Sequence, residues 1–111
     1  MEIAVRRESR LVIVDMAGEI DVNAVPRIRD TLGDLTKAAS PQIVVNLSRA
    51  TYIDSSGLGA LMAARRDALK GGGRFALCGM TKDVRMVLEL TRLNKFFEIY
   101  DDEAAAHARF T

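Results

Sequence analysis

The sequence predicts an α/β domain built on a mixed, mostly parallel sheet of four to five strands, with about four helices. Short runs rich in β-branched residues alternate with longer segments whose apolar residues recur every three or four positions, as they do in helices. A strand candidate at residues 43–47, a helix candidate at about 56–70 and a strand candidate at 74–79 follow one another. Strand, long helix and strand in this order imply a right-handed parallel crossover.

The length and composition of the chain indicate one domain. Its 111 residues suffice for a single core, and 49% hydrophobic and 28% charged residues are typical of a soluble globular protein. Sixteen basic side chains against fifteen acidic ones leave no basic excess for a nucleic acid, and no apolar run is long enough to cross a bilayer. The N-terminus lacks a signal-peptide pattern, and a single cysteine excludes an internal disulfide and a cysteine-clustered metal site. We therefore expect one domain over residues 1–111, in the cytoplasm, with no metal, cofactor, nucleic-acid or membrane partner.

The N-terminal residues predict a hairpin. Residues 1–6 are a weak strand candidate, and residues 11–17 are a stronger one because β-branched side chains cluster there. The polar segment 7–10 between them is short enough for a hairpin turn. Residues 18–21, Gly-Glu-Ile-Asp, are expected to turn the chain out of the second strand.

A helix and a buried strand are expected next. Asn23 is placed to cap a helix that begins at Ala24 and ends near Pro41, which cannot continue it; Pro26 is tolerated in its first turn. The core face of this helix would carry apolar residues three and four positions apart: Val25, Ile28, Leu32 and Leu35. Residues 43–47 form a nearly continuous apolar run, which predicts a central strand buried on both faces.

The longest helix candidate runs from about Ser56 to Lys70. On a helical wheel, one face collects apolar side chains: Leu58, Leu61, Met62, Ala68 and Leu69. Arg65 falls among them, and we expect its stem to pack while its guanidinium reaches solvent. The opposite and flanking surface carries Gly59, Ala60, Ala63 and Arg66, most of which are small. This surface is either a docking patch for another protein or a consequence of the preference of alanine for helices.

The C-terminal third of the chain predicts a strand, a helix, a short edge strand and a last helix. Three consecutive glycines would end the long helix just before the strand at 74–79. Thr81 is placed to cap a helix with one packed side: Val84, Val87, Leu88 and Thr91. Residues 97–100 suit a short edge strand. Acidic residues directly precede a last helix over 104–109, where the helix dipole favours them.

The segment 53–59, Ile-Asp-Ser-Ser-Gly-Leu-Gly, joins the central strand to the long helix. Asp54, Ser55 and Ser56 can each accept a hydrogen bond from a free N–H group of the first helical turn. The two glycines remove side chains where we expect something to approach the backbone closely. One interpretation is an ordinary helix start, with one serine capping and one solvated. The other interpretation is a serine hydroxyl held at the positive end of a helix. A phosphate on that hydroxyl would be stabilised by the free N–H groups and repelled by Asp54. This balance favours a phosphate that is added and removed reversibly.

No set of residues predicts an enzyme. The only histidine, His107, falls in the last turn of the terminal helix, so we expect it to be exposed to solvent and to form no triad with Ser55 or Ser56. The Gly-Leu-Gly run lacks the third glycine of a dinucleotide fingerprint and the Gly-Lys-Ser/Thr of a P-loop. Cys78 lies in an apolar strand and is interpreted as a small buried hydrophobe. We therefore expect no catalytic residue.

Residues 53–59, preceded by Val-Val-Asn-Leu-Ser at 44–48, resemble the phosphorylation-site signature of the STAS-domain anti-sigma-factor antagonists. The order of the predicted elements is similar to the STAS fold from end to end, and residues 18–21 and 72–75 support the likeness. One departure is Asn46, where the family often has aspartate, although asparagine keeps an acceptor there.

A second departure is Arg92, where many relatives have glycine at the end of the penultimate helix. A left-handed residue at that position favours glycine, so the resemblance leaves the local backbone open. The serine segment is not affected by either departure.

The resemblance implies a switch. In this family the serine directly after the aspartate, here Ser55, is phosphorylated by a partner that is both anti-sigma factor and GHKL-type serine kinase. The unphosphorylated protein binds the anti-sigma factor and frees the sigma factor, phosphorylation breaks the complex, and a metal-dependent serine phosphatase resets it. The resemblance also leaves room for a weak homodimer. The partner-binding residues that it implies lie around the serine and on the following helix: Asp21, Asp54, Ser56, Gly57, Leu58, Gly59, Ala60, Ala63 and Arg66.

Other functions stay open at this point. The same domain occurs as a non-phosphorylated accessory subunit of lipid-trafficking ABC transporters, where it docks on the ATPase. It also occurs in stress-signalling assemblies and as the tail of anion transporters. A binder of small molecules that uses the helix N-terminus as an anion site is a third class.

Overall fold

The structure, a computed structural model, describes residues 1–110. Its elements follow in the order β1 (Glu2–Glu8), β2 (Leu11–Ile20), α1 (Val25–Leu35), β3 (Gln42–Ile53), α2 (Ser55–Lys70), β4 (Arg74–Cys78), α3 (Lys82–Leu90), η1 (Leu93–Lys95), β5 (Glu98–Tyr100) and α4 (Glu103–Phe110). Here η1 is a single turn of 3-10 helix. The predicted α/β architecture is confirmed, with five strands in the sheet.

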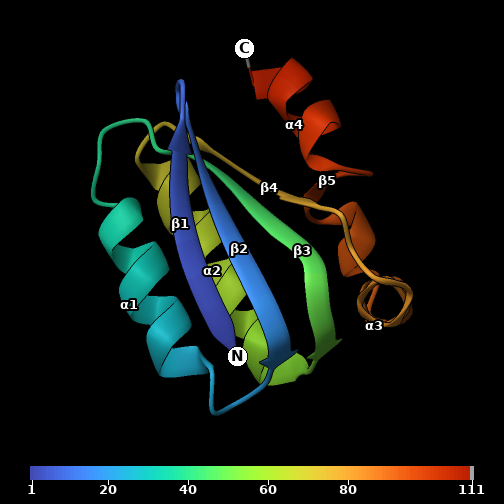
Figure 1. The fold of residues 1–111 in the computed structure, drawn as a ribbon. Coiled ribbons are helices and arrows are strands. Elements are labelled where there is room, and N and C mark those ends of the chain that lie inside the picture. The colour runs from blue at the N-terminus through green and yellow to red at the C-terminus, as the bar shows by residue number, and fades with distance from the viewer. Residues whose placement is uncertain (111) are drawn as a thin grey trace.

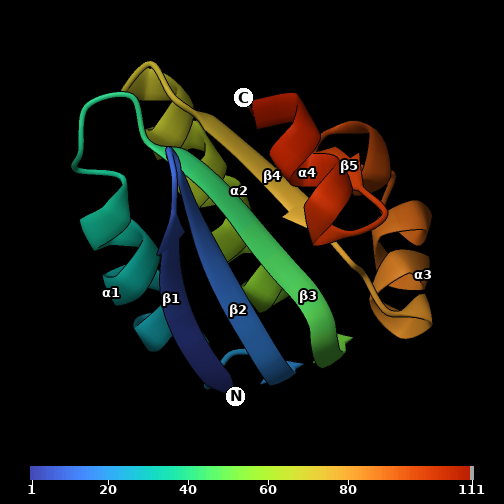
Figure 2. The same cartoon turned by 45° about the horizontal axis from the view of Figure 1, so that its top comes forward.

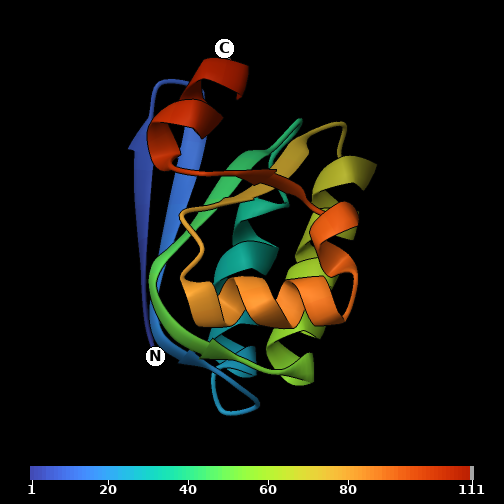
Figure 3. The ribbon, with the colours of Figure 1, turned by 90° about the vertical axis from the view of Figure 1, so that its right-hand side faces the viewer.

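The strands lie in the sheet in their sequence order, β1-β2-β3-β4-β5 (Figure 1). The hairpin of β1 and β2 is antiparallel, and each of the three following pairs is parallel. Figure 2 shows α1 and α2 together behind the strands, and Figure 3 shows α4 on the opposite side of the sheet from α1, α2 and α3. The sheet is therefore mixed and mostly parallel, as the sequence predicts.

The sheet separates two apolar cores. The larger core lies between the sheet and helices α1, α2 and α3, and the smaller core lies beneath α4. Successive residues of β3 alternate between them: Ile43, Val45 and Leu47 join the larger core, and Val44 joins the smaller one. These four side chains have no exposed surface, so the prediction of a strand buried on both faces is confirmed.

The second strand is longer than predicted. Residues 18–20 do not turn the chain, because they continue β2 and pair with β3, which itself extends to Ile53. Glu19 lies opposite Tyr52, and Ile20 lies opposite Ile53. The pairing partner supplies strand geometry that the local Gly-Glu-Ile-Asp composition does not favour. The chain turns only after Ile20.

The predicted cap of α1 is wrong. The N-cap position is Ala24, which makes no side-chain cap bond, and the helix begins at Val25. The backbone N–H of Asn23 instead donates to the Asp21 carboxylate at 3.0 Å, in the turn that precedes the helix. The predicted core face is confirmed, since Ile28 and Leu32 are buried and Val25 and Leu35 are partly buried against the same core.

Helix α2 packs much as predicted, apart from its last turn. Leu58, Leu61 and Ala68 are buried and Met62 is partly buried. Leu69 is 45% exposed, so its assignment to the core is wrong. It lines a groove beside Phe96 instead of facing the sheet. The Arg65 guanidinium lies over the Phe96 ring, 4.2 Å from the centroid, rather than simply reaching solvent.

The C-terminal elements differ from expectation in local detail. Thr81 is at the N-cap position of α3, but its hydroxyl donates to the Ala50 carbonyl at 2.9 Å and makes no cap bond. The β4 strand ends at Cys78, because Gly79 has a positive φ of 68°. Arg92 has φ 62° and ψ 13°, the left-handed conformation that glycine adopts without strain. The last helix is confirmed, and the Asp102 carboxylate caps it by accepting from the Ala105 N–H at 2.8 Å.

Candidate functional site: the start of helix α2

The connection from β3 to α2 is capped by Asp54. Asp54 has extended backbone geometry, and its carboxylate accepts a hydrogen bond from the Gly57 N–H at 3.0 Å. The Leu58 N–H donates to the Asp54 carbonyl at 2.9 Å, which begins the helical ladder. The Asp54 N–H donates to the Ile20 carbonyl at 3.3 Å and ties this start to the end of β2. The cap is therefore the aspartate and not one of the serines.

The two glycines of the segment have different environments. A Cβ placed on Gly57 would lie 2.4 Å from the Ile20 carbonyl oxygen and 2.8 Å from Ile20 Cγ2. The close approach expected at Gly57 is thus made by the chain itself. A Cβ on Gly59 would meet nothing within 4 Å, so no described part of the chain approaches it closely, and a close approach by another protein stays a prediction.

Ser55 is the first residue of α2, and its side chain is exposed. It lies with Ser56 in a shallow hollow between the starts of α1 and α2, whose other lining residues are Val22, Val25, Pro26, Arg29 and Gly59. Within residues 1–110, neither serine hydroxyl has a hydrogen-bond partner. The N–H groups of both serines precede the first intrahelical bond and point along the positive end of the helix dipole. The hollow can therefore accept an anionic group on Ser55.

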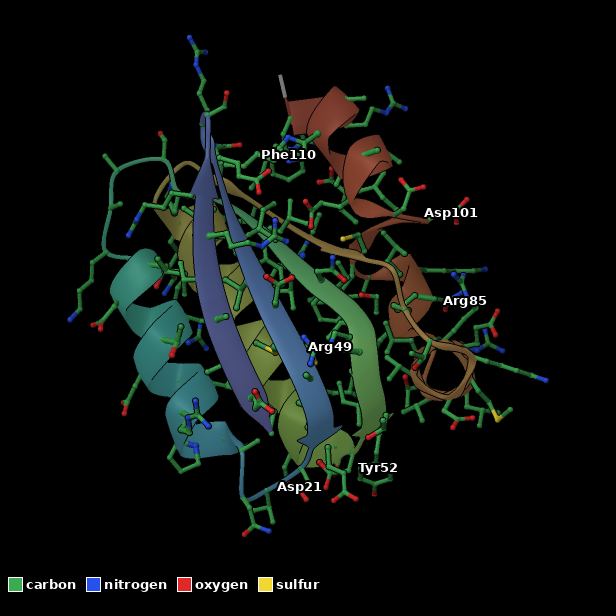
Figure 4. All side chains as sticks on the ribbon, viewed as in Figure 1. Asp21, Arg49, Tyr52, Arg85, Asp101 and Phe110 are labelled. Atoms are coloured by element: carbon green, nitrogen blue, oxygen red, sulfur yellow. The ribbon has the colours of Figure 1, made fainter. Side chains whose placement is uncertain are left out.

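The structure exposes only some of the predicted partner-binding residues. Gly57, Leu58 and Ala60 are buried and offer almost no surface to a partner; Leu58 and Ala60 pack in the larger core, and Gly57 lets α2 approach Ile20 closely. The others remain accessible in whole or in part: Asp21, Asp54, Ser56, Gly59, Ala63 and Arg66. Figure 4 shows Asp21 and Tyr52 at the end of the molecule where α2 begins.

Two accessible residues were not predicted from the sequence. Val22, which lines the hollow, is 63% exposed, and Tyr52 at the end of β3 is 48% exposed. Exposed apolar and aromatic side chains beside a candidate docking site are typical anchors for a protein partner. The sequence carries no local signal for either residue. Tyr52 belongs to β3 and Val22 to the turn before α1, and an apolar residue at such a position is as often buried as exposed.

On the other side of the sheet, a polar cluster joins α4 to β1, β2 and β3. Arg6 donates to the carboxylates of Asp15 and Glu8, both at 2.6 Å, and to Glu103. Asn46 Nδ2 donates to Glu103 at 3.1 Å, while Asn46 Oδ1 accepts from the Ser48 N–H at 2.9 Å. Asn46 thus does keep an acceptor, as the family resemblance implies.

The same cluster corrects the expectation for His107. Its Nε2 lies 3.0 Å from Glu8 Oε1, so the ring is held against β1 and is not simply solvated. Ligand atoms of Glu8, Glu103 and His107 come within 4.8 Å of one another, the one such grouping within residues 1–110. Arg6 already bonds both carboxylates, and its hydrogen bond to Glu103 lowers the pKa of that carboxyl. An ion-pair network that fastens α4 to the sheet accounts for this arrangement.

The remaining candidate nucleophile is inaccessible. Cys78 is fully buried in the smaller core, and this burial raises the pKa of its thiol to about 12. A thiol with so high a pKa does not form the reactive thiolate near neutral pH.

Among residues 1–110, no helix is both long enough and apolar enough to cross a membrane.

Known proteins share both the sequence pattern and the fold. A family model for the STAS domain matches residues 2–106. The anti-sigma F factor antagonist of Paenibacillus polymyxa is 27% identical over 107 residues, covering 96% of this chain and 92% of that protein. A putative anti-sigma factor antagonist from Thermotoga maritima superimposes with a TM-score of 0.89 at 26% identity, covering 97% and 93% of the two chains. The anti-sigma factor antagonist SpoIIAA in its unphosphorylated form has a TM-score of 0.79 at 25% identity, covering 97% and 96%.

These three relatives are named as antagonists of other proteins and not as enzymes, in agreement with the expectation from the sequence. The family match extends over almost the whole chain and includes the β3-α2 connection described above. The chain belongs to the STAS domain family.

Proposed function

We propose that this STAS domain is an anti-sigma-factor antagonist controlled by phosphorylation of Ser55. One observation carries the proposal: Asp54 caps α2, which leaves the Ser55 hydroxyl exposed and without a hydrogen bond within residues 1–110. A serine needed for capping would be engaged with the backbone, whereas this one is available to a kinase. The names of the relatives support the antagonist role.

The partner would dock on the Ser55 surface, which we define as the accessible residues around the start of α2: Asp21, Val22, Ser55, Ser56 and Gly59. Gly59 offers no side chain, so another protein can approach the helix closely. Val22 supplies an apolar contact, and Asp21 supplies a charge near the rim. Such a small surface with one apolar anchor suits a reversible complex better than a permanent one.

A phosphate on Ser55 adds a charge of about −1.5 to −2 at the centre of this surface. Within the free protein the first-turn N–H groups and the nearby Arg29 favour that charge, while Asp54 opposes it. The fold should therefore change little on phosphorylation. Release would come from the bulk and repulsion of the phosphate against a partner that had packed on the unmodified serine.

The partner in this proposal is an anti-sigma factor with GHKL-type serine kinase activity. The unmodified protein binds it and frees the sigma factor, and the kinase then modifies Ser55 and dissociates. A metal-dependent serine phosphatase removes the phosphate and restores binding. The kinase transfers the γ-phosphoryl group of ATP to the Ser55 oxygen and releases ADP, and the phosphatase hydrolyses the phosphoserine to serine and phosphate. Each cycle thus consumes one ATP, and both chemical steps are catalysed by the partners.

Intact mass spectrometry with peptide mapping of the protein recovered from its native cells tests the modification. We expect one phosphate on Ser55, absent from a Ser55→Ala variant and present in a Ser56→Ala variant. The second variant is a matched control, because it removes a neighbouring hydroxyl from the same hollow. Phosphate on Ser56 alone would contradict the assignment. No phosphate under any growth condition would favour a constitutive docking subunit, as in the lipid-trafficking ABC transporters.

Binding to the anti-sigma factor tests the switch. Ser55→Ala should bind and resist release by ATP, whereas Ser55→Glu should bind at least about tenfold more weakly, equivalent to about 1.4 kcal/mol. Ser56→Glu controls for a negative charge one residue further along the helix. Tight binding by Ser55→Glu would contradict the electrostatic account of release.

A further inference from the structure

We propose that a second docking site, the Phe96 groove, binds an acidic amphipathic helix of another protein. The Phe96 groove runs along α2 from Gly59 to Lys70, beside Phe96, which follows η1. Its lining comprises Gly59, Met62, Ala63, Arg65, Arg66, Leu69, Lys70 and Phe96. The groove shares Gly59 with the Ser55 surface and includes Ala63 and Arg66, but its apolar wall and its cations go beyond the proposed switch because they lie further along α2.

The wall of the groove is apolar, exposed and held in place. Leu69 is 45% exposed and Phe96 is 39% exposed. The Phe96 ring meets the buried Phe97 edge-on at 5.2 Å between centroids, and Arg65 lies over the same ring at 4.2 Å. These contacts fix the ring without covering it. Two large apolar side chains in one preformed groove therefore provide area that a partner could bury.

The charge of the groove specifies what kind of partner fits. Arg65, Arg66 and Lys70 all line it, although the whole chain has a net charge of only +1. One acidic residue, Asp67, neighbours them and pairs with Arg66 at 3.3 Å, but both side chains are largely exposed, so the pair neutralises little. A partner with acidic residues flanking its apolar face would gain complementary contacts.

The same charge argues against a second copy of this chain as the occupant. Two copies that met through the Phe96 groove about a twofold axis would bring both sets of three cations together. Like charges opposed across an interface disfavour association. The sheet also offers no strand edge within the lining of the groove, so an extended peptide could not add a strand there. A helix, with apolar residues at i, i+3 or i+4, and i+7, fits a groove beside another helix.

The Phe96 groove is electrically separate from the phosphorylation site. The groove cations Arg65, Arg66 and Lys70 follow Ser55 by ten, eleven and fifteen positions in α2, or about 15 to 22 Å along the helix axis at about 1.5 Å per residue. The Debye length at physiological ionic strength is about 8 Å, so a charge on Ser55 is largely screened there. Binding at the groove should therefore persist in both states of the switch.

Fluorescence anisotropy with a labelled helical peptide tests the site. The probe is about 16 residues of leucine and glutamate with leucine at heptad spacing, long enough to span about 24 Å, and its counterpart has lysine for every glutamate. We expect the glutamate peptide to bind at least about tenfold more tightly than the lysine peptide. Amide chemical-shift changes should be confined to residues 59–70 of α2 and the neighbourhood of Phe96.

Paired charge reversals provide the control. Arg66→Glu with Lys70→Glu should weaken binding of the glutamate peptide at least about tenfold, whereas Arg7→Glu with Arg10→Glu, the same charge change at the β1-β2 hairpin, should not. Thermal unfolding of both double variants checks that each is folded. Leu69→Ala supplies a second variant that removes apolar contact and no charge. Ser55→Glu should leave peptide binding unchanged even where it abolishes binding of the anti-sigma factor.

Several outcomes would overturn the proposal. Equal affinity for the two peptides would remove the charge argument, and chemical-shift changes elsewhere would place the site wrongly. A dimer in sedimentation that Arg66→Glu with Lys70→Glu dissociates would make a second copy the occupant. Binding to vesicles of phosphatidylglycerol without binding to the glutamate peptide would make a lipid surface the occupant. Loss of peptide binding in Ser55→Glu would show that the groove is part of the switch.

Discussion

The Asp54 carboxylate accepts a hydrogen bond from the Gly57 N–H at 3.0 Å, and this contact decides what the neighbouring serines are free to do. It satisfies a first-turn donor that a serine would otherwise have to satisfy. It also draws the backbone of Gly57 against Ile20, so that α2 starts directly beside the end of β2. Ser55 is left on the outer side of the turn.

Asp54→Ala should destabilise the domain by about 1 kcal/mol, the usual cost of losing an N-cap side chain. The expected readout is the free energy of unfolding in urea at neutral pH. Asp54→Ser is the matched control, since serine is an equally good cap and should recover most of the loss. If alanine and serine gave the same stability, the carboxylate contact would not stabilise the helix start.

The two glycines of α2 should respond in opposite directions to alanine. Gly57→Ala places a Cβ 2.4 Å from the Ile20 carbonyl oxygen, so the backbone must move. The free energy of unfolding should fall by about 1 to 3 kcal/mol. Gly59→Ala meets open space in a helix interior and should raise stability by roughly 0.5 to 1 kcal/mol. Chemical denaturation of the two variants beside the parent protein measures both effects. Equal losses would mean that Gly59 is also closely approached.

Arg92→Gly should stabilise the domain by about 1 kcal/mol, because Arg92 has the left-handed backbone conformation that costs an L side chain about 1 to 2 kcal/mol. Arg92→Ala removes the same charge and keeps the backbone penalty, so it should give no such gain. A rise in the midpoint of thermal unfolding for glycine alone would support this assignment. A rise for alanine as well would attribute the gain to charge.

The ion-pair cluster under α4 should make stability fall in acid. The pKa of Glu103 is lowered in the folded protein, chiefly by its hydrogen bond to Arg6, from an ordinary value of 4.5. A carboxylate with a depressed folded pKa adds stability above its unfolded pKa, and this contribution is lost as the pH falls through the folded value. The stability difference between the parent protein and Glu103→Gln should thus be present at neutral pH and shrink below about pH 4.5.

Urea unfolding at several pH values measures this difference. Glu89→Gln is the control, because Glu89 is exposed on α3 and makes no ion pair within residues 1–110. Its stability difference from the parent should stay small and nearly constant across the same range. A pH-independent difference for Glu103→Gln would exclude the carboxylate as the source.

Local sequence patterns were enough for the elements whose own residues specify them. The apolar run at 43–47 predicted a strand buried on both faces, and the spacing of Ile28 and Leu32 predicted the packed side of α1. Local patterns could not predict which of the three residues 54–56 caps α2. Aspartate and serine are equally good caps, and only the geometry of the chain arriving from β3 selects Asp54.

The fold class, the family resemblance and the candidate serine followed from the sequence alone, because hydrophobic periodicity and short motifs are properties of neighbouring residues. Tertiary structure decided which residues are reachable and which distant groups meet. It buried Leu58 and Ala60 while exposing Leu69, and it brought Arg6, Glu103 and His107 together from opposite ends of the chain. The reason is physical: periodicity fixes which face of an element is apolar, but only the packing of the other elements fixes how much of that face is covered.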